Sequence, residues 1–237
     1  MAENHLALHV GTSGYSYKEW KGSFYPKDLP AAQMLEFYAH RFGAVEINNT
    51  FYRMPKASVL EEWAAHVPED FHFTLKAPQS ITHFKRLKDA EESVAYFLRE
   101  AGALQQRLGP LLFGLPPNFK KDLPRLIDFL ELIPKPYRVA FEFRHDSWFD
   151  DQVFDAMRQR QAALCIAEAE DGPKVPQVAT AGWGYLRLRL AEYSDADLQR
   201  WLKWMRQQKW REAFIFFKHE DEARGPAFAK RFLELAR

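Results

Sequence analysis

The chain has 237 residues, of which 33 are Lys or Arg, 32 are Asp or Glu, and 47% are apolar. This apolar fraction excludes disordered and collagen-like chains, and the single cysteine, Cys165, excludes a scaffold held by intrachain disulfides. The formal net charge of +1 excludes a strong overall attraction to nucleic acid or to an anionic membrane surface.

Eight short apolar segments recur along the chain, and each is predicted to be a β-strand. All are rich in Val, Ile, Phe or Leu, which is typical of strands covered on at least one face. In chain order they are residues 6–10, 44–48, 71–76, 111–115, 138–144, 162–167, 184–189 and 212–218.

Segments with the apolar spacing of helices lie between these strands. They cover residues 34–42, 59–67, 94–108, 123–133, 153–157, 198–205 and 228–235. Ser58, with Glu61 three residues later, predicts a capping box at the start of the second helix, and Gly109 is expected to end the third. Residues 168–183 hold Gly, two Pro and no helical spacing, so the sixth helix is expected to be reduced to a loop.

Alternating strands and helices predict an α/β fold with parallel strands, because a parallel neighbour needs a long crossover connection. Eight such strands in this length match a single (β/α)8 TIM barrel. An open doubly wound sheet is the alternative, but the Gly-rich phosphate turn common in that fold is absent. With no linker or repeat in view, residues 1–237 are expected to form one domain.

Four strands place polar side chains on the face that is expected to point into the barrel. Because side chains alternate along a strand, apolar residues such as Val45 and Ile47 face the helices and their neighbours face the lumen. The inward set is Glu46, Asn48, His72, Thr74, Lys76, Glu142, Arg144, Tyr185, Arg187 and Arg189. A buried structural ion network is one interpretation. Because burying ions is costly and barrel enzymes keep their sites at the C-terminal ends of the strands, a ligand site is preferred.

The charges of these inward residues indicate which kind of ligand the site would bind. Cations outnumber carboxylates, which suits a phosphate or carboxylate group. The eight His are scattered without paired spacing, so no metal is predicted, and no cofactor is predicted either.

Catalytic roles are assigned to Glu46 and Glu142 as base or acid, to Lys76 in stabilising negative charge, and to His83 as an alternative proton carrier. A plain surface position for His83 is equally open. The substrate-binding residues are predicted to be Ser13, Tyr15, Asn48, Tyr52, Arg144, Trp148, Arg187 and Lys218. Residues 11–17 either form an anion-binding nest or sugar-binding wall, or pack as an aromatic turn. Asp146 or Ser147 is a candidate helix cap.

Several motifs in order resemble the YecE-like family, also called domain of unknown function 72. They are Gly11-Thr12-Ser13-Gly14-Tyr15, Trp20-x-Gly22-x-Phe24-Tyr25-Pro26, Val45-Glu46-Ile47-Asn48-x-Thr50-Phe51-Tyr52, Phe73-x-x-Lys76 with Ile81-Thr82-His83, Leu115-Pro116-Pro117, Glu142-x-Arg144-x-x-Ser147-Trp148, and Thr180 with Tyr185-Leu186-Arg187-Leu188. The resemblance covers nearly the whole chain and implies a TIM barrel without a settled activity. The chain departs from the family pattern at Arg189-Leu190 and at Lys218-His219-Glu220.

The residues therefore predict an enzyme that acts on a small anionic substrate by metal-free acid–base chemistry at the C-terminal face of the barrel. A hydrolase, lyase or isomerase acting on a phosphorylated or sugar-like substrate fits this description. Whether the protein is catalytic at all, its substrate and its oligomeric state stay open. The alternative is a nucleic-acid-binding protein or phosphodiesterase resembling endonuclease-type TIM barrels, to which Lys85, Arg86 and Lys88 would contribute.

A cytoplasmic location is expected. Cys165 has no partner in the chain, which suits a reducing compartment. No apolar run reaches the roughly 20 residues that span a bilayer, and residues 1–10 lack the marks of a secretory signal. No membrane partner is therefore predicted.

Overall fold

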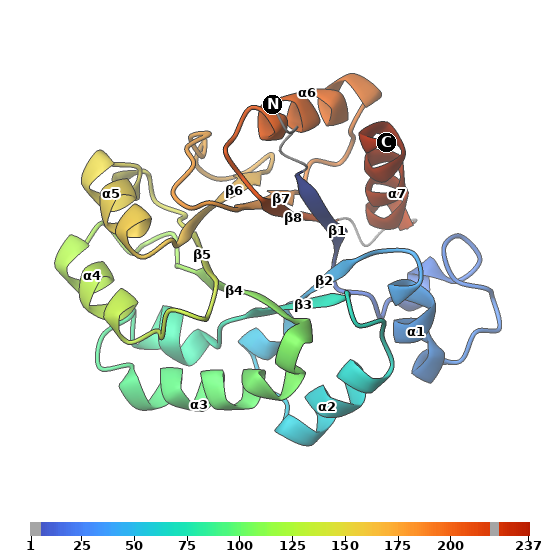
Figure 1. The fold of residues 1–237 in the computed structure, drawn as a ribbon, viewed down its shortest axis with the longest axis horizontal. Helices are drawn as coiled ribbons and strands as arrows, with labels where there is room; N and C mark the ends of the chain where they lie inside the picture. The colour runs from blue at the N-terminus through green and yellow to red at the C-terminus, as the bar shows by residue number, and fades with distance from the viewer. Residues whose placement is uncertain (1–5, 219–222) are drawn as a thin grey trace.

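The eight strands pair with their sequence neighbours into one closed parallel barrel, in which β8 returns to β1 (Figure 1). The structure is a computed structural model that describes residues 6–218 and 223–237. Its strands are β1 (Ala7–Ser13), β2 (Ala44–Ile47), β3 (His72–Lys76), β4 (Leu108–Gly114), β5 (Val139–Glu142), β6 (Ala163–Glu168), β7 (Gly184–Leu188) and β8 (Glu212–Phe217). The predicted TIM barrel is therefore confirmed.

Helices surround the barrel and cover the outer faces of its strands (Figure 1). They are α1 (Met34–Ala39), α2 (Ala57–Ala65), α3 (Glu91–Ala101), α4 (Leu123–Glu131), α5 (Asp151–Gln159), α6 (Asp195–Arg206) and α7 (Arg224–Ala236). Residues 169–183 join β6 to β7 without a helix, as predicted from their Gly and Pro content. None of the helices in residues 6–218 and 223–237 is long and apolar enough to cross a membrane.

The two faces of the strands bury different side chains. Outward residues such as Val45, Phe73 and Phe141 are fully buried against the helices. The lumen is filled by a separate cluster of small and aromatic side chains, namely Ala44, Leu112, Ala140, Ala163, Cys165, Trp183, Tyr185, Phe214 and Phe216. The barrel is therefore a packed core beneath its C-terminal rim.

β1 is longer than predicted, because it continues past Val10 to Ser13. Thr12 and Ser13 pair with Val45 and Glu46 of β2 and are buried. Their polar side chains face internal hydrogen-bond partners, so they do not mark the end of the strand as polar residues ordinarily would.

Two predicted helix boundaries are wrong. Ser58 lies inside α2 and does not cap it, because the N–H of Ala57 donates to Glu100 Oε2 of α3 at 2.9 Å. A carboxylate from a neighbouring helix thus takes the place of a local cap. Gly109 does not end α3, which stops at Ala101 and continues as a 3-10 segment, η5 (Gly102–Arg107). Gly109 instead belongs to β4, where an added Cβ would lie 3.1 Å from the carbonyl oxygen of Phe73.

Ionisable side chains lie at the N-terminal end of the barrel. His9 stacks on Phe214 and lies edge-on to His72, with 4.5 Å between ring centroids in each pair. Glu212 pairs with His9 at 3.2 Å and with Arg138. Burial, with the nearby His9 and Arg138, lowers the pKa of His72 to about 4. The folded protein therefore keeps this imidazole neutral.

We expect His72 to make the protein less stable as pH falls from 7.5 to 5. The unfolded chain protonates His72 near pH 6.5, whereas the folded chain does so near pH 4, so stability falls through this window. The partial exposure of the ring reduces the effect to about 1 kcal/mol of unfolding free energy. Urea unfolding at both pH values measures it, and the loss should shrink in His72→Gln but not in His40→Gln, at an exposed histidine. Equal pH dependence in wild type and His72→Gln would contradict the assignment.

Candidate functional site

Glu46 of β2 is the centre of a buried hydrogen-bond network at the C-terminal end of the barrel. Its Oε1 accepts hydrogen bonds from Ser13 Oγ (2.8 Å), Asn48 Nδ2 (3.1 Å) and Arg187 Nη2 (2.8 Å). Its Oε2 accepts from the hydroxyl of Tyr185 at 2.6 Å. Burial alone would raise the pKa of Glu46, but the Arg187 guanidinium and these donors lower it below its ordinary value. The group is therefore held as a carboxylate.

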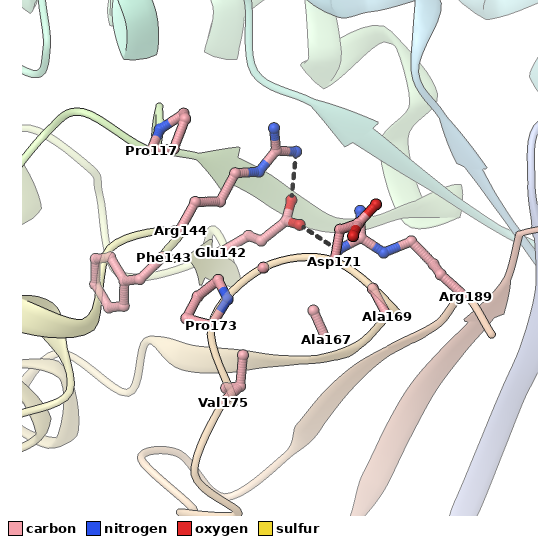
Figure 2. Close-up of a pocket in the computed structure, with 11 residues that line it drawn as sticks. Pro117, Glu142, Phe143, Arg144, Ala167, Ala169, Asp171, Pro173, Val175 and Arg189 are labelled. Carbon is pink, nitrogen blue, oxygen red and sulfur yellow. Dashed lines mark hydrogen bonds and ion pairs between the residues drawn. The ribbon is translucent and has the colours of Figure 1, made fainter.

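Arg187 of β7 joins this network to a second buried carboxylate, Glu142 of β5. Arg187 Nη1 donates to Glu142 Oε2 at 2.7 Å. Arg144 contacts the same oxygen at 3.3 Å, and Arg189 pairs with Oε1 at 3.0 Å. Figure 2 shows Glu142 between the Arg144 and Arg189 guanidinium groups. Burial opposes ionisation of Glu142, but the three arginines and Lys76 hold its pKa far below the ordinary range.

The site has two layers that differ in exposure. Glu46, Glu142 and Arg187 are almost completely buried, at 0%, 1% and 2% exposure. Arg144 and Arg189 lie above them, with 33% and 22% of their side-chain surface exposed. The inner layer is a buried ion network, which was the alternative interpretation of the inward-facing charges. The outer layer is the part that solvent reaches, and Glu142 meets the pocket from beneath it.

A pocket of about 230 Å³ opens over this outer layer (Figure 2). Its charged lining comprises Glu142, Arg144, Arg189 and Asp171, and the last of these lies on the exposed β6–β7 loop. Its apolar lining includes Pro117, Phe143, Ala167, Pro173 and Val175. A few polar groups among apolar walls are the usual lining of a small-molecule site. The loop that replaces the sixth helix thus forms one wall of the pocket.

Lys76 of β3 also lies close to Glu142. A Cβ added to Gly114 would lie 3.2 Å from Glu142 Oε2 and 3.6 Å from Lys76 Cε, so both side chains pass over this glycine. Lys76 Nζ lies 4.6 Å from the centre of the Phe51 ring. Burial and the neighbouring Arg187 lower the pKa of Lys76 to about 8, although Glu142 opposes this shift.

Aromatic residues form the rim beside Lys76. Phe51 belongs to η3 (Asn49–Phe51) and contacts the rings of Tyr52 and His83, with centroid distances of 5.0 and 4.9 Å. Tyr52 is 74% exposed. Phe51 was not among the predicted site residues. Its position shortly after the second strand could have predicted a place at the C-terminal end of the barrel.

His83 lies in the helical turn η4 (Ser80–Phe84) after β3 and is partly exposed. Its Nδ1 lies 2.9 Å from Thr82 Oγ1, which leaves the other ring nitrogen for other contacts. Burial, together with Arg144 and Lys76, lowers its pKa. His83 therefore lies at the rim of the site, and its role as a proton carrier stays a prediction.

Of the eight predicted substrate-binding residues, only Arg144 lines the pocket. Trp148 is fully buried behind the wall, where its indole N–H donates to the Phe119 carbonyl at 2.6 Å and its ring stacks on Phe143. Tyr15 is half-buried near Tyr38, with 6.1 Å between ring centroids. Lys218 is exposed just beyond β8, and His219 and Glu220 lie outside the described residues. Trp148 therefore supports the wall and does not line it.

At the end of β1, two polar groups that could have served an anion nest bond to the protein itself. The N–H of Gly14 donates to the carbonyl of Glu46 at 2.8 Å, and Thr12 Oγ1 donates to the carbonyl of Gly14 at 2.6 Å. Both groups are used inside the protein, so neither is available to a bound anion.

Neither Asp146 nor Ser147 caps α5. That role belongs to Asp150, which accepts from the N–H of Gln152 at 3.0 Å. Ser147 Oγ instead accepts from the N–H of Lys121 at 2.8 Å. The polar residues after β5 thus fasten two loops together.

Arg189 and Asp171 are charged pocket residues that were not among the predicted site residues. Arg189 had a signal in the sequence. It occupies the third inward position of the seventh strand, and the same alternation that identified Arg187 predicts that it faces the lumen.

Across residues 6–218 and 223–237, no three His, Cys, Asp or Glu side chains are grouped as metal ligands would be.

The comparisons with known proteins agree on one family. A sequence model described as "Protein of unknown function DUF72" matches residues 9–237. The UPF0759 protein YecE of Escherichia coli K12 is 31% identical over 143 residues, which are 60% of this chain and half of the length of YecE. The UPF0759 protein YunF of Bacillus subtilis is 25% identical, with 96% of this chain and 94% of YunF covered.

Solved structures resemble the chain over nearly its full length. The crystal structure of the DUF72 family protein TM1631 of Thermotoga maritima matches with a TM-score of 0.81 and 27% identity, covering 98% of this chain and 99% of that one. The DUF72 family protein EF0366 of Enterococcus faecalis matches with a TM-score of 0.77 and 19% identity, covering 98% of each chain. The second likeness concerns the fold alone.

Proposed function

The chain belongs to the DUF72 family, and from that premise we propose that it is an enzyme that binds a small anionic substrate over Glu142, Arg144 and Arg189. The names of its relatives specify no reaction, so the proposal depends on the geometry of this site. The substrate would carry a phosphate or carboxylate group, and the reaction would be acid–base chemistry performed by the protein's own side chains.

The observation that carries the proposal is an excess of positive charge at a partly open pocket. Lys76, Arg144, Arg187 and Arg189 supply four cations against the two buried carboxylates, Glu46 and Glu142. Asp171 at the outer wall adds a third carboxylate and leaves one positive charge unbalanced. An anion bound between Arg144 and Arg189 would balance that charge through hydrogen bonds worth about 1.5–3 kcal/mol each.

The environment of each group suggests its role. Because arginines hold Glu46 and Glu142 as carboxylates of lowered pKa, both are weak bases at neutral pH. Glu46 would hold Arg187 in place, and Glu142 would stabilise positive charge on the substrate. Lys76 would stabilise negative charge on the substrate, and His83 would carry protons at the rim. Arg144 and Arg189 would hold the anion.

Nucleic-acid binding remains the rival function, but the pocket favours a small molecule. Its volume of about 230 Å³ fits a compact ligand, and its wall from the β6–β7 loop encloses that ligand. We also propose that the enzyme works in the cytoplasm, because its single cysteine is buried and unpaired.

Titration calorimetry with inorganic phosphate or sulfate tests the proposal. We expect wild type to bind one anion and Arg144→Gln to bind it at least about tenfold more weakly, because the variant loses a charged hydrogen bond. Arg211→Gln removes the same charge at the opposite end of the barrel and should leave the affinity within about twofold. No anion binding at millimolar concentrations, or an equal loss in both variants, would count against the site. Tighter, strongly salt-dependent binding of a single-stranded oligonucleotide would favour the rival function.

A further inference from the structure

We propose that Lys76 is a nucleophile that forms an imine with an aldehyde or ketone group of the substrate. The substrate class would then be a small carbonyl compound that also carries a phosphate or carboxylate. This inference rests on the proposed anion site and adds to it a covalent step and a reacting group.

The contacts of Lys76 differ from those of every other cation in the site. Arg144, Arg187 and Arg189 each pair with Glu142. Among the residues that the structure describes, none forms a hydrogen bond or ion pair with Lys76 Nζ, which lies over the face of the Phe51 ring, 4.6 Å from its centre. A neutral amine at this position therefore gives up no ion pair, and its lone pair is available for reaction.

The surroundings of Lys76 increase the fraction of the neutral amine. The charged groups that act on it are Arg187 of β7 and Arg144 after β5, which favour loss of its proton, and Glu142 of β5 and Glu46 of β2, which oppose it. Burial adds to the effect of the arginines, and the pKa falls to about 8. At pH 7.5 about a quarter of Lys76 would be neutral, against about 0.1% of an ordinary lysine. Lysines activated by desolvation and a neighbouring cation are the usual imine-forming nucleophiles.

The geometry also brings Lys76 close to Glu142. Because residue 114 is a glycine, Lys76 Cε and Glu142 Oε2 can both pass within 4 Å of the position that its Cβ would take. Arg144 and Arg189 flank Glu142 above the pocket (Figure 2). Neither Lys76 nor Phe51 lines this pocket, so a substrate whose anionic group lies between these arginines would extend past Glu142 to reach the amine beside Phe51.

The step balances without an oxidant or reductant. The Nζ lone pair forms a bond to the carbonyl carbon, while the carbonyl π pair moves to the oxygen, which takes up a proton as Nζ releases one. The resulting carbinolamine is protonated on its hydroxyl and loses water, which leaves a protonated imine. His83 at the rim would carry these protons, and the Glu142 carboxylate would stabilise the cationic imine. The imine withdraws electrons from the adjacent carbon, which would stabilise a carbanion formed there by proton loss or by cleavage of a carbon–carbon bond.

Reductive labelling with two aldehydes tests the step on the intact protein. Glyoxylate carries a carboxylate and formaldehyde does not, and cyanoborohydride traps either imine on the lysine, which peptide mass spectrometry then locates. At pH 7.5 we expect Lys76 to be labelled by formaldehyde at least about tenfold faster than Lys85, an exposed lysine nine residues later. Glyoxylate should increase that preference, and inorganic phosphate should suppress the glyoxylate labelling of Lys76 alone.

Each result has a distinct meaning. If Lys76 reacts with both aldehydes no faster than Lys85 does, the nucleophile is refuted, even where phosphate still binds. If Lys76 reacts quickly with formaldehyde but shows no glyoxylate preference and no phosphate protection, the anion site fails instead. Lys76→Arg keeps the charge and should still bind phosphate, whereas Lys85→Arg should leave Lys76 labelling unchanged. The labelling rate of wild-type Lys76 should rise through a midpoint near pH 8, and a midpoint near pH 10 would overturn the inference.

Discussion

Replacing Arg187 with Met is expected to lower the free energy of unfolding by about 3–5 kcal/mol, the usual cost of leaving buried charges without their partner. Arg187 donates to Glu46 at 2.8 Å and to Glu142 at 2.7 Å, and all three side chains are almost completely buried. Without the guanidinium, two carboxylates remain in a site from which water is excluded. Chemical denaturation of wild type and variant at pH 7 measures the loss.

Two further variants separate this effect from a loss of packing. In Arg187→Met with Glu46→Gln, one stranded charge is removed while the shape is kept, so at least half of the lost stability should return. Arg144→Met also removes a partner of Glu142, but Arg144 is one-third exposed, so its loss should cost less than about 1 kcal/mol. Equal losses for Arg144→Met and Arg187→Met would contradict the division of the site into a buried and an exposed layer.

The pH dependence of the Arg187→Met variant should also change sign. In wild type the pKa of Glu46 is lowered on folding, so its contribution to stability is present above the ordinary Glu pKa and is lost in acid. Without Arg187, burial would raise the pKa of Glu46, so the stability it contributes would be present at low pH and lost as pH rises. The variant should therefore lose less stability relative to wild type at pH 5 than at pH 7.

Gly11→Ala is expected to cost more than about 3 kcal/mol and to reduce the yield of folded protein, because rigid backbone has no room for the added methyl. The new Cβ would lie 1.8 Å from the Ala44 carbonyl oxygen and 2.7 Å from the Tyr38 hydroxyl. That hydroxyl also accepts from the N–H of Thr12 at 2.7 Å, so the clash would disturb the pairing of β1 with β2. Because this pairing sets Ser13 opposite Glu46, the site should lose its geometry as well.

Gly43→Ala is the matched control. Gly43 lies one residue before β2, and an added Cβ there meets no atom within 4 Å. Thermal unfolding followed by circular dichroism compares the two variants. Gly43→Ala should melt within about 2 °C of wild type, and a Gly11→Ala protein that does the same would refute the steric argument.

The strand pattern was predictable because alternation along a strand is a local property. Val45 and Ile47 are apolar and Glu46 is not, so the direction of Glu46 follows from its neighbours alone. The same reasoning correctly turned Glu142 and Arg187 inward. It held for Lys76 even though the register of β3 against β4 shifts between Phe73 and Leu75.

Other features needed contacts that the sequence does not contain. The carboxylate that accepts a hydrogen bond from the first N–H of α2 belongs to Glu100, more than forty residues away. The local pattern at Ser58 therefore predicted the wrong cap. Trp148 was predicted to bind substrate, yet it is completely buried, with Phe119 and Phe143 among its contacts. Burial of this kind depends on which loops meet, and periodicity within one segment cannot report it.

By itself, the sequence determined the eight-fold alternation, the parallel barrel, the missing sixth helix and the set of charged side chains that face the lumen, because each follows from spacing between near neighbours. The tertiary structure alone decided which charges are neutralised and which remain available. Arg187 became the buried bridge between two carboxylates, whereas Lys76, on a neighbouring part of the same rim, was left beside an aromatic ring. The electrostatic energy of a charged group depends on its distance from other charges and from water. Those distances are set only when β2, β3, β5 and β7 close into one barrel.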